Sequence, residues 1–298
     1  MSTKIATLYF TLILLCFNIS KIFGVVPSIN VTLFDNSTRS RVQITKFDDQ
    51  TEYIHPFDVV EVKINAKRVY YVASWDKIAI LNENFSYVSD IDFPDYKQAL
   101  FVASIEKALF FTDFDDEDFV SPDHFIYKFD FDLKLLNSFN LSGSAAGLFY
   151  DDQSEMLYVT DFTYNLVYIL NKDLTKVLDS FRSVAPWFVL TLNGKIFVSS
   201  INRITIYDAK TKQILRVLDG LCDNSGDIIL KFSVDINENI VYPCLYWSDF
   251  RLISSNGTQI GQPIPIRASE ESTGPFSVYL DSVGNILVME NGAIEVFY

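Results

Sequence analysis

Short apolar runs that lead into a turn recur along the chain at nearly even spacing. Each run has two or three apolar or aromatic residues and ends on a small or acidic residue. The six runs end at Ser74, Asp113, Asp161, Ser200, Cys244 and Glu290, in steps of 39, 48, 39, 44 and 46 residues. A period of this length, in units rich in strand-forming residues, is typical of the blades of a β-propeller.

Each unit contains short apolar segments separated by turn-forming residues, without helical periodicity. In the third unit the predicted strands are 147–151, 157–160, 166–170 and 176–181. The other complete units have predicted strands at 59–64, 68–73, 77–81 and 86–91; at 98–104, 108–112, 124–130 and 135–140; at 187–192, 195–199, 203–208 and 214–218; and at 228–234, 239–242, 250–254 and 258–264. These segments predict four antiparallel strands in each blade.

The sixth unit is one strand short. Its only predicted strands are 276–280, 285–288 and 293–298, whereas the strand-like segments 30–33 and 41–47 belong to no complete unit. Addition of one of them, preferably 41–47, to the sixth unit would close the ring and remove exposed strand edges. The sequence therefore predicts an all-β, six-bladed propeller over residues 25–298.

Residues 1–24 resemble a secretory signal peptide. Lys4 precedes an apolar run from Ile5 to Phe17, and Gly24 offers a small residue at the predicted cleavage site. The run is shorter than the roughly 20 apolar residues that span a bilayer comfortably. An uncleaved anchor is the alternative. We expect a secreted protein, or one in the lumen of the secretory pathway, with no membrane span after removal of the signal.

The chain is strongly acidic, with a formal net charge of −14. Loss of Lys4 and Lys21 with the signal leaves 38 acidic and 22 basic residues, a net charge of −16. Such a surface repels phosphate backbones, so nucleic acid is not an expected partner. The charge favours solubility, and attraction of cations or basic partners is the alternative interpretation.

Two cysteines remain after the signal, since Cys16 lies within it. Cys222 lies in the connection that enters the fifth unit, and Cys244 ends the second strand of that unit. Both should reach the same face of the ring. We therefore predict a disulfide that closes a loop of 23 residues in an oxidising compartment.

Five N-x-S/T acceptor sites follow the signal and predict a glycosylated surface. They are Asn30, Asn36, Asn84, Asn140 and Asn256. Asn84 and Asn256 fall between predicted third and fourth strands. Glycans there would obstruct a partner that approached that face.

Two segments resemble known propeller repeats. Leu157 to Asp173 (LYVTDFTYNLVYILNKD) resembles an NHL repeat, and Leu245 to Phe250 (LYWSDF) resembles the YWTD repeat of lipoprotein-receptor propellers. The resemblance extends over units two to six, and its motifs are short and degenerate. It implies a six-bladed ring, and it implies no particular activity because these propellers serve very different functions.

The end of each second strand is a candidate position for metal ligands. In a propeller, the connections that enter innermost strands and those between second and third strands share one face, here called the upper face; the other turns form the lower face. Asp113, Asp161 and Glu290 should therefore surround the upper end of the channel, where carboxylates suit calcium. Similarity to paraoxonase and gluconolactonase propellers would imply a catalytic calcium, but their Glu and Asn ligand positions have no match here. The alternative is that each acid accepts hydrogen bonds from its own turn.

Tryptophan is a candidate for recognition on the same face. Trp75 and Trp247 lie in connections between second and third strands, and Trp187 lies where the chain enters the innermost strand of the fourth unit. Together they would form a platform for a ligand or a protein. Packing against neighbouring loops is the alternative.

The remaining candidate motifs exclude several enzyme classes. With only His55 and His124, the chain lacks the residues for a three-histidine zinc site. The sequence GSAAG at 143–147 is not a nucleophile elbow, so a serine triad is not predicted. The acidic run at 113–118 lacks the glycine and distal glutamate of an EF-hand, and is read as a solvated loop, with a weak calcium site or a docking patch for a basic partner as alternatives.

Of three possible functions, the sequence favours the first, and the other two are its alternatives. The first is a secreted, non-enzymatic binding or scaffolding propeller that recognises a protein, peptide or glycan through its upper face and needs no cofactor. The second is a calcium-dependent hydrolase of the lactonase or arylesterase type, with the metal in the central channel. The third is a structural matrix or coat component. The sequence predicts no oligomeric state.

Overall fold

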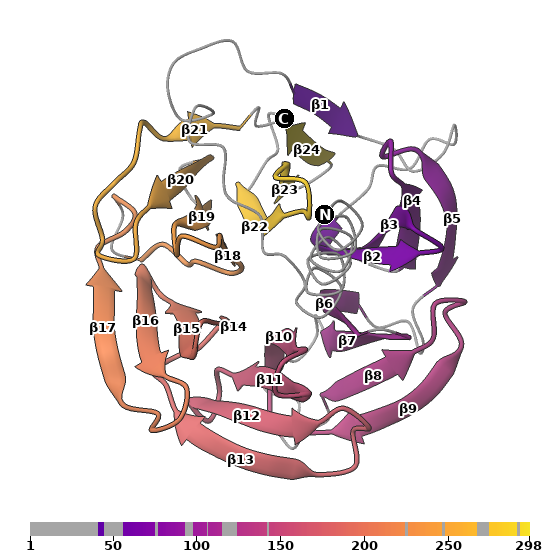
Figure 1. The fold of residues 1–298 in the computed structure, drawn as a ribbon, viewed down its shortest axis with the longest axis horizontal. Helices are drawn as coiled ribbons and strands as arrows, with labels where there is room; N and C mark the ends of the chain where they lie inside the picture. Colours follow the sequence, from indigo (N-terminus) through magenta and orange to yellow (C-terminus); the bar gives the residue numbers. More distant parts are fainter. Residues whose placement is uncertain are drawn as a thin grey trace, which may run out of the picture.

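The protein is a closed ring of six four-stranded antiparallel sheets, arranged around a central axis (Figure 1). The computed structural model describes residues 41–44, 56–74, 77–92, 98–105, 107–114, 124–141, 143–223, 226–245, 248–266, 274–290 and 293–298. This arrangement confirms the predicted all-β, six-bladed propeller. No helix long and apolar enough to cross a membrane occurs in these ranges.

Each blade runs outward from the central axis, with its first strand innermost. Blade one contains β2 (Pro56–Ile64), β3 (Lys67–Ser74), β4 (Lys77–Asn82) and β5 (Tyr87–Asp92). Blade two contains β6 (Gln98–Ile105), β7 (Ala108–Phe114), β8 (Phe125–Phe129) and β9 (Leu135–Asn140). Blade three contains β10 (Ala145–Asp151), β11 (Met156–Asp161), β12 (Leu166–Asn171) and β13 (Val177–Arg182).

Blades four to six follow the same plan. Blade four contains β14 (Phe188–Leu192), β15 (Lys195–Ser200), β16 (Arg203–Asp208) and β17 (Ile214–Asp219). Blade five contains β18 (Ser233–Val234), β19 (Ile240–Cys244), β20 (Asp249–Ile253) and β21 (Ile264–Pro265). Blade six contains β22 (Pro275–Leu280), β23 (Ile286–Glu290), β24 (Ala293–Phe297) and β1 (Arg41–Ile44).

The two ends of the chain meet in blade six. Strand β1 pairs antiparallel with β24, with Arg41 opposite Phe297 and Ile44 opposite Ile294. Figure 1 shows β1 beside β24, at the outer edge of that sheet. The prediction that the N-terminal segment completes the sixth blade is therefore confirmed. Segment 30–33, the less favoured candidate, lies outside the described residues.

Blade five departs most from the predicted strands. The predicted strands 228–234 and 258–264 shrink to the two-residue strands β18 and β21. Residues before β18 pair across to other blades, since Ile228 bridges Ile201 and Lys231 bridges Ser277. In β21, Pro265 has no N–H to give to a strand ladder. Tertiary pairing and proline thus shorten strands that their apolar pattern predicts to be longer.

Aromatic residues pack between blades and across the axis. Phe110 of blade two stacks on Tyr150 of blade three, with ring centroids 6.1 Å apart. Nearer the axis, Phe188 contacts both Phe101 and Phe232, at 6.0 and 5.5 Å. Large aromatic surfaces buried in this way contribute strongly to the stability of the ring. The three rings from blades two, four and five form a central aromatic cluster.

Inner strands of blades three and four approach closely at Gly147. Its N–H donates to the carbonyl oxygen of Trp187 at 2.8 Å, and a Cβ at this position would lie 2.4 Å from that same oxygen. No larger residue fits without displacing the backbone of blade four. Gly147 of the GSAAG sequence therefore serves packing between blades.

Candidate functional site

The connections of blades three and four present aromatic side chains on the upper face. Phe162 follows β11 and stacks on Trp187 with centroids 4.8 Å apart and ring planes at 16°. The backbone of Trp187 is held on both sides, because its N–H donates to Ser199 O at 2.9 Å and its carbonyl accepts from Gly147 N. The half-buried indole is thus fixed at the start of β14.

Exposed apolar side chains lie in the same two connections as this stack. Tyr164 is 56% exposed and Val184 is 73% exposed. Asn165 joins their two connections, since its backbone oxygen accepts from Ser183 N at 3.0 Å and its Oδ1 accepts from Ala185 N at 2.7 Å. We call Phe162, Tyr164, Val184 and Trp187 the upper patch. Its backbone is held by hydrogen bonds while much of its apolar surface faces solvent.

The predicted upper-face acids are buried. Asp113, Asp161 and Glu290 are each at most 1% exposed. Oδ1 of Asp113 accepts from Phe125 N at 2.7 Å, and Oδ1 of Asp161 accepts from Tyr164 N at 3.0 Å. Burial raises the pKa of Asp161, and hydrogen bonds from the backbone oppose that shift. Asp113 and Asp161 thus accept hydrogen bonds from the connection that follows their own strand. This is the geometry of the alternative interpretation, in which the acids support their turns. The expectation that these acids add charge to an exposed recognition surface is corrected by their burial.

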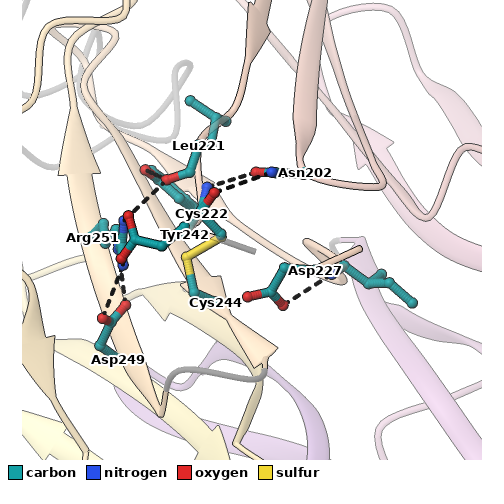
Figure 2. Close-up of a disulfide and its surroundings, with 10 residues drawn as sticks. Asn202, Leu221, Cys222, Asp227, Tyr242, Cys244, Asp249 and Arg251 are labelled. Atoms are coloured by element: carbon teal, nitrogen blue, oxygen red, sulfur yellow. Dashed lines mark hydrogen bonds and ion pairs between the residues drawn. A yellow bond between two sulfur atoms is a disulfide. The ribbon is translucent and has the colours of Figure 1, made fainter. Parts of the chain in front are cut away.

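The described residues contain one group of three potential metal ligands, and it does not include these acids. Cys222, Asp227 and Cys244 have ligand atoms within 4.8 Å of one another. Figure 2 shows, however, that the two sulfur atoms are joined in a disulfide. A disulfide offers no thiolate, which is the form of cysteine that binds metals. The geometry therefore gives no calcium or zinc centre at this position.

The predicted disulfide is confirmed between Cys222 and Cys244, whose Cα atoms are 5.8 Å apart. Asn202 holds the backbone on one side of it, accepting from Cys222 N at 2.6 Å and donating to Cys222 O at 3.1 Å. The hydroxyl of Tyr242 donates to Leu221 O at 2.9 Å. The connection between blades four and five is thus held to blade four by Asn202 and to β19 by Tyr242 and the disulfide.

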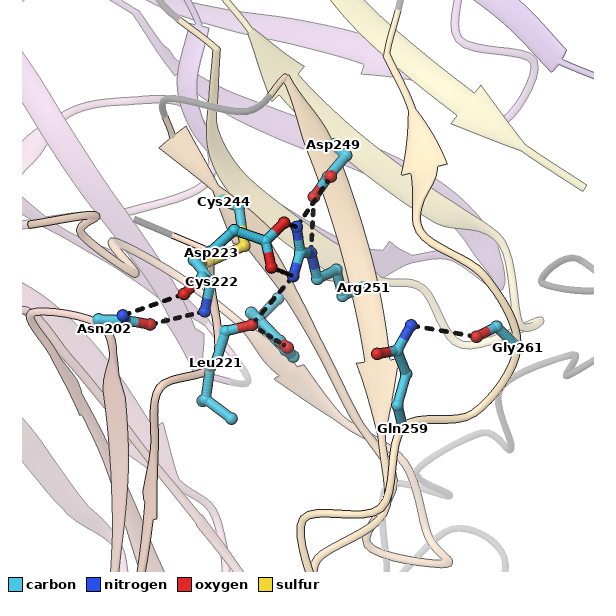
Figure 3. Close-up of polar contacts among 10 residues, drawn as sticks. Asn202, Leu221, Cys222, Asp223, Cys244, Asp249, Arg251, Gln259 and Gly261 are labelled. Carbon is cyan, nitrogen blue, oxygen red and sulfur yellow. Dashed lines mark hydrogen bonds and ion pairs between the residues drawn. A yellow bond between two sulfur atoms is a disulfide. The ribbon is translucent and has the colours of Figure 1, made fainter. Parts of the chain in front are cut away.

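Arg251 adds an ion-pair network beside the disulfide (Figure 3). Its side chain is 8% exposed and pairs with Asp223 at 2.7 Å and Asp249 at 3.0 Å. Hydrogen bonds from the guanidinium hold the pKa of Asp223 below its ordinary value, whereas burial raises the pKa of Asp249. These ion pairs and hydrogen bonds all form within blade five and the connection that enters it. We therefore interpret the network as structural.

Sequence reasoning missed a buried ion pair near the axis. Nζ of Lys231 donates to Oδ1 of Asp58, and the two side chains are 6% and 0% exposed. Burial raises the pKa of Asp58 and lowers the pKa of Lys231, while the attraction between the two charges opposes both shifts. The available signal was a charged residue inside an apolar innermost strand, as in FDVVEV and ILKFSV.

Several predicted residues lie outside the part of the chain that the structure describes. These are the signal at 1–24, His55, the acidic residues 115–118, Trp75, Trp247, Asn30 and Asn36. Within the described part, Asn84, Asn140 and Asn256 are all exposed. Asn84 lies between β4 and β5, and Asn256 between β20 and β21, as predicted. Of the three tryptophans, Trp187 alone belongs to the described site.

Comparisons with known proteins show the fold. No family model matches the chain, and no curated protein matches it in sequence. The WD40 β-propeller domain of Doa1 matches with a TM-score of 0.59 and 12% identity, over 84% of this chain and 94% of that one. Virginiamycin B lyase from Staphylococcus aureus matches with a TM-score of 0.61 and 10% identity, over 87% and 99%.

A chain of the mitotic checkpoint complex matches with a TM-score of 0.55 and 12% identity, over 79% of this chain and 77% of that chain. Identities this low show the propeller architecture alone. The resemblance to NHL and YWTD repeats is not confirmed by a family match. Function has to be argued from the site.

Proposed function

We propose that this protein is a secreted, non-enzymatic binding module that recognises a protein or peptide through its upper face. The observation that carries the proposal is the upper patch. Aromatic residues, Tyr and Trp above all, are enriched in the buried centres of protein interfaces. Here they stand on connections whose backbone is held by Asn165, Ser199 and Gly147. Little conformational entropy is therefore lost when a partner binds.

Two further observations support this assignment. The disulfide fits an oxidising compartment, and three exposed acceptor asparagines fit passage through a glycosylating pathway. One structure that shares the fold is a protein assembly, the mitotic checkpoint complex. Glycans at Asn84 and Asn256 would obstruct the outer part of the lower face in blades one and five, away from the upper patch.

The experiment first identifies the partner, by cross-linking in the native secretion and mass spectrometry, and then measures its affinity. Tyr164→Ala and Val184→Ser remove exposed apolar surface without opening the core. Tyr164→Ala should weaken binding about tenfold or more, and Val184→Ser should weaken it less. Trp187→Ala should do the same, with thermal denaturation to check its fold. We expect equal losses from Trp75→Ala and Trp247→Ala if the platform includes them.

The matched controls are Asn84→Gln and Asn256→Gln on the lower face, which should leave affinity unchanged. The reverse pattern would place the interface on the lower face. A partner released by free glycans would indicate a lectin. Ester hydrolysis lost on calcium removal would instead support the hydrolase alternative, and self-assembly at high concentration would support the matrix alternative.

A further inference from the structure

A cavity of about 270 Å³ lies on the axis of the ring. It is lined from all six innermost strands, by Val60, Ala103, Leu148, Leu190, Val234 and Leu280 among others. An apolar cavity of roughly 150 Å³ is large enough to hold benzene. This cavity therefore has room for a small organic molecule, and its walls are mainly aliphatic and aromatic.

The cavity occupies the lower half of the channel. Phe101 and Phe188 stack across the axis at 6.0 Å, and the lining residues of β6 and β14 follow them along the strands toward the lower face. Asp152, which is exposed and lies in the lower turn after β10, also lines the cavity. The mouth is thus at the centre of the lower face. Asn84 and Asn256 lie in turns at the outer side of their blades, away from this mouth.

Lys231 is the one cation among the residues that line the cavity. Its ammonium lies 5.2 Å from the ring centroid of Phe188 and 5.3 Å from that of Tyr279. It donates to Oδ1 of Asp58 and, at 3.3 Å, to the carbonyl oxygen of Val59. An ammonium has three N–H donors, and these described contacts engage two of them. One donor is left to recognise an acceptor atom of a ligand.

The buried pair also selects the charge of a ligand. Asp58 already compensates the charge of Lys231, so a bound anion would add a buried charge without a partner, at a large cost in desolvation. A neutral molecule with an acceptor oxygen adds a hydrogen bond to a charged donor and no net charge. Hydrogen bonds of that kind are stronger than those between neutral groups.

We propose that the lower half of the channel binds a small, neutral, mainly apolar molecule that carries a carbonyl oxygen, such as a ketone, ester or amide. Lys231 donates to that oxygen, and the aliphatic walls hold the apolar body. The site is separate from the upper patch. Its existence does not depend on the protein partner proposed above, and either can fail alone.

Three probes of similar shape test the proposal. Each is titrated against the intact mature protein, and binding is monitored by ligand-observed NMR. Acetophenone has the carbonyl oxygen, ethylbenzene lacks it, and benzoate carries a full negative charge. We expect acetophenone to bind about tenfold more tightly than ethylbenzene, the usual effect of one hydrogen bond to a charged group. Benzoate should bind least. Equal affinities, or no binding of acetophenone, would overturn the proposal.

Two variants locate the bound probe. Ala103→Leu narrows the cavity and keeps the ion pair, so it should reduce acetophenone binding at least tenfold, whereas Ala209→Leu adds the same carbons in an outer turn and should not. The double variant Asp58→Asn/Lys231→Met should retain ethylbenzene binding and lose the preference for acetophenone. Unchanged acetophenone affinity in Ala103→Leu would place binding elsewhere and refute the assignment.

Discussion

At the scale of single residues, the Asp58 and Lys231 pair is the most consequential feature. Both charges are withdrawn from water, and Asp58 also accepts from the backbone N–H groups of Val59 and Val102 at 2.7 and 2.9 Å. It thereby joins the inner strands of blades one and two, while Lys231 joins them to blade five. Such a pair adds little net stability over an apolar equivalent, but removal of one partner is costly.

We predict that Lys231→Met lowers the free energy of unfolding by about 3–5 kcal/mol at pH 7, because Asp58 stays buried without its partner. Burial then holds the folded pKa of Asp58 above its ordinary value of 3.8. The loss of free energy of unfolding should be smallest below pH 3.8, where Asp58 is protonated in both states. It should grow as pH rises from 3.8 to the folded pKa. Urea denaturation at pH 4 and pH 7 measures this difference.

Lys63→Met, at an exposed lysine, is the matched control and should show no such pH dependence. Asp58→Asn/Lys231→Met should recover much of the stability. A loss in Lys231→Met that is the same at both pH values would show that Asp58 is already protonated beside Lys231, contrary to the ion pair described above.

At the scale of elements, the turns between third and fourth strands of blades one to three share one design. Asn82 ends β4, and its Oδ1 accepts from the N–H groups of Asn84 and Ser86 at 2.9 and 3.1 Å. In the turn after β12, Oδ1 of Asn171 accepts from the N–H groups of Thr175 and Lys176, both at 3.0 Å. Three residues later, Phe85 and Leu174 are buried with φ of 60° and 54°. An Asn or Asp followed three residues later by Phe or Leu is therefore a sequence signature of this turn. In blade one the turn places the acceptor Asn84 on the surface.

The closing strand β1 provides the element-scale prediction. Without it, β24 would present an unpaired edge of mainly apolar residues, which favours aggregation. Deletion of residues 25–48 should therefore cause aggregation or a large fall in melting temperature. Deletion of 25–39 keeps β1 and is the control. Light scattering and thermal denaturation compare the two, and a monomeric 25–48 deletion that melts within a few degrees of the control would contradict the role of β1.

At the scale of the whole molecule, the two faces of the ring differ. The upper face carries the upper patch and, at the end of β9, the acceptor Asn140, whereas the lower face carries the acceptors Asn84 and Asn256 at its outer turns and the mouth of the cavity at its centre. If both proposals hold, one ring would bind a protein on one side and a small molecule on the other. It depends on passage through a secretory pathway, which the exposed acceptor asparagines make testable.

We predict that Asn84, Asn140 and Asn256 are glycosylated when the full chain is expressed in a eukaryotic secretory host. Digestion with an N-glycosidase should lower the apparent mass of the secreted protein and convert each occupied asparagine to aspartate, which mass spectrometry detects. The triple Asn→Gln variant should show no shift from these three sites. Retention of the native chain in the cytosol, unglycosylated, would contradict the secreted assignment.

Much of the architecture was predictable because a propeller repeats one local pattern. Alternating apolar strands, turn residues and an even period define a blade without long-range information. The disulfide between Cys222 and Cys244 followed from the position of each cysteine in its blade. Blade five was predicted least well, because its inner residues pair with neighbouring blades and its outer strand contains proline.

The sequence by itself determined the class, number and order of the blades, the closure by β1 and the cysteine pair, since each depends on local pattern and position within a repeat. Only the tertiary structure decided which polar residues are buried, because burial depends on neighbours far apart in the chain. Asp113 and Asp161 became supports of their own connections, and Asp58 and Lys231, 173 residues apart, became one ion pair. The cavity beside that pair likewise exists only when all six innermost strands surround the axis.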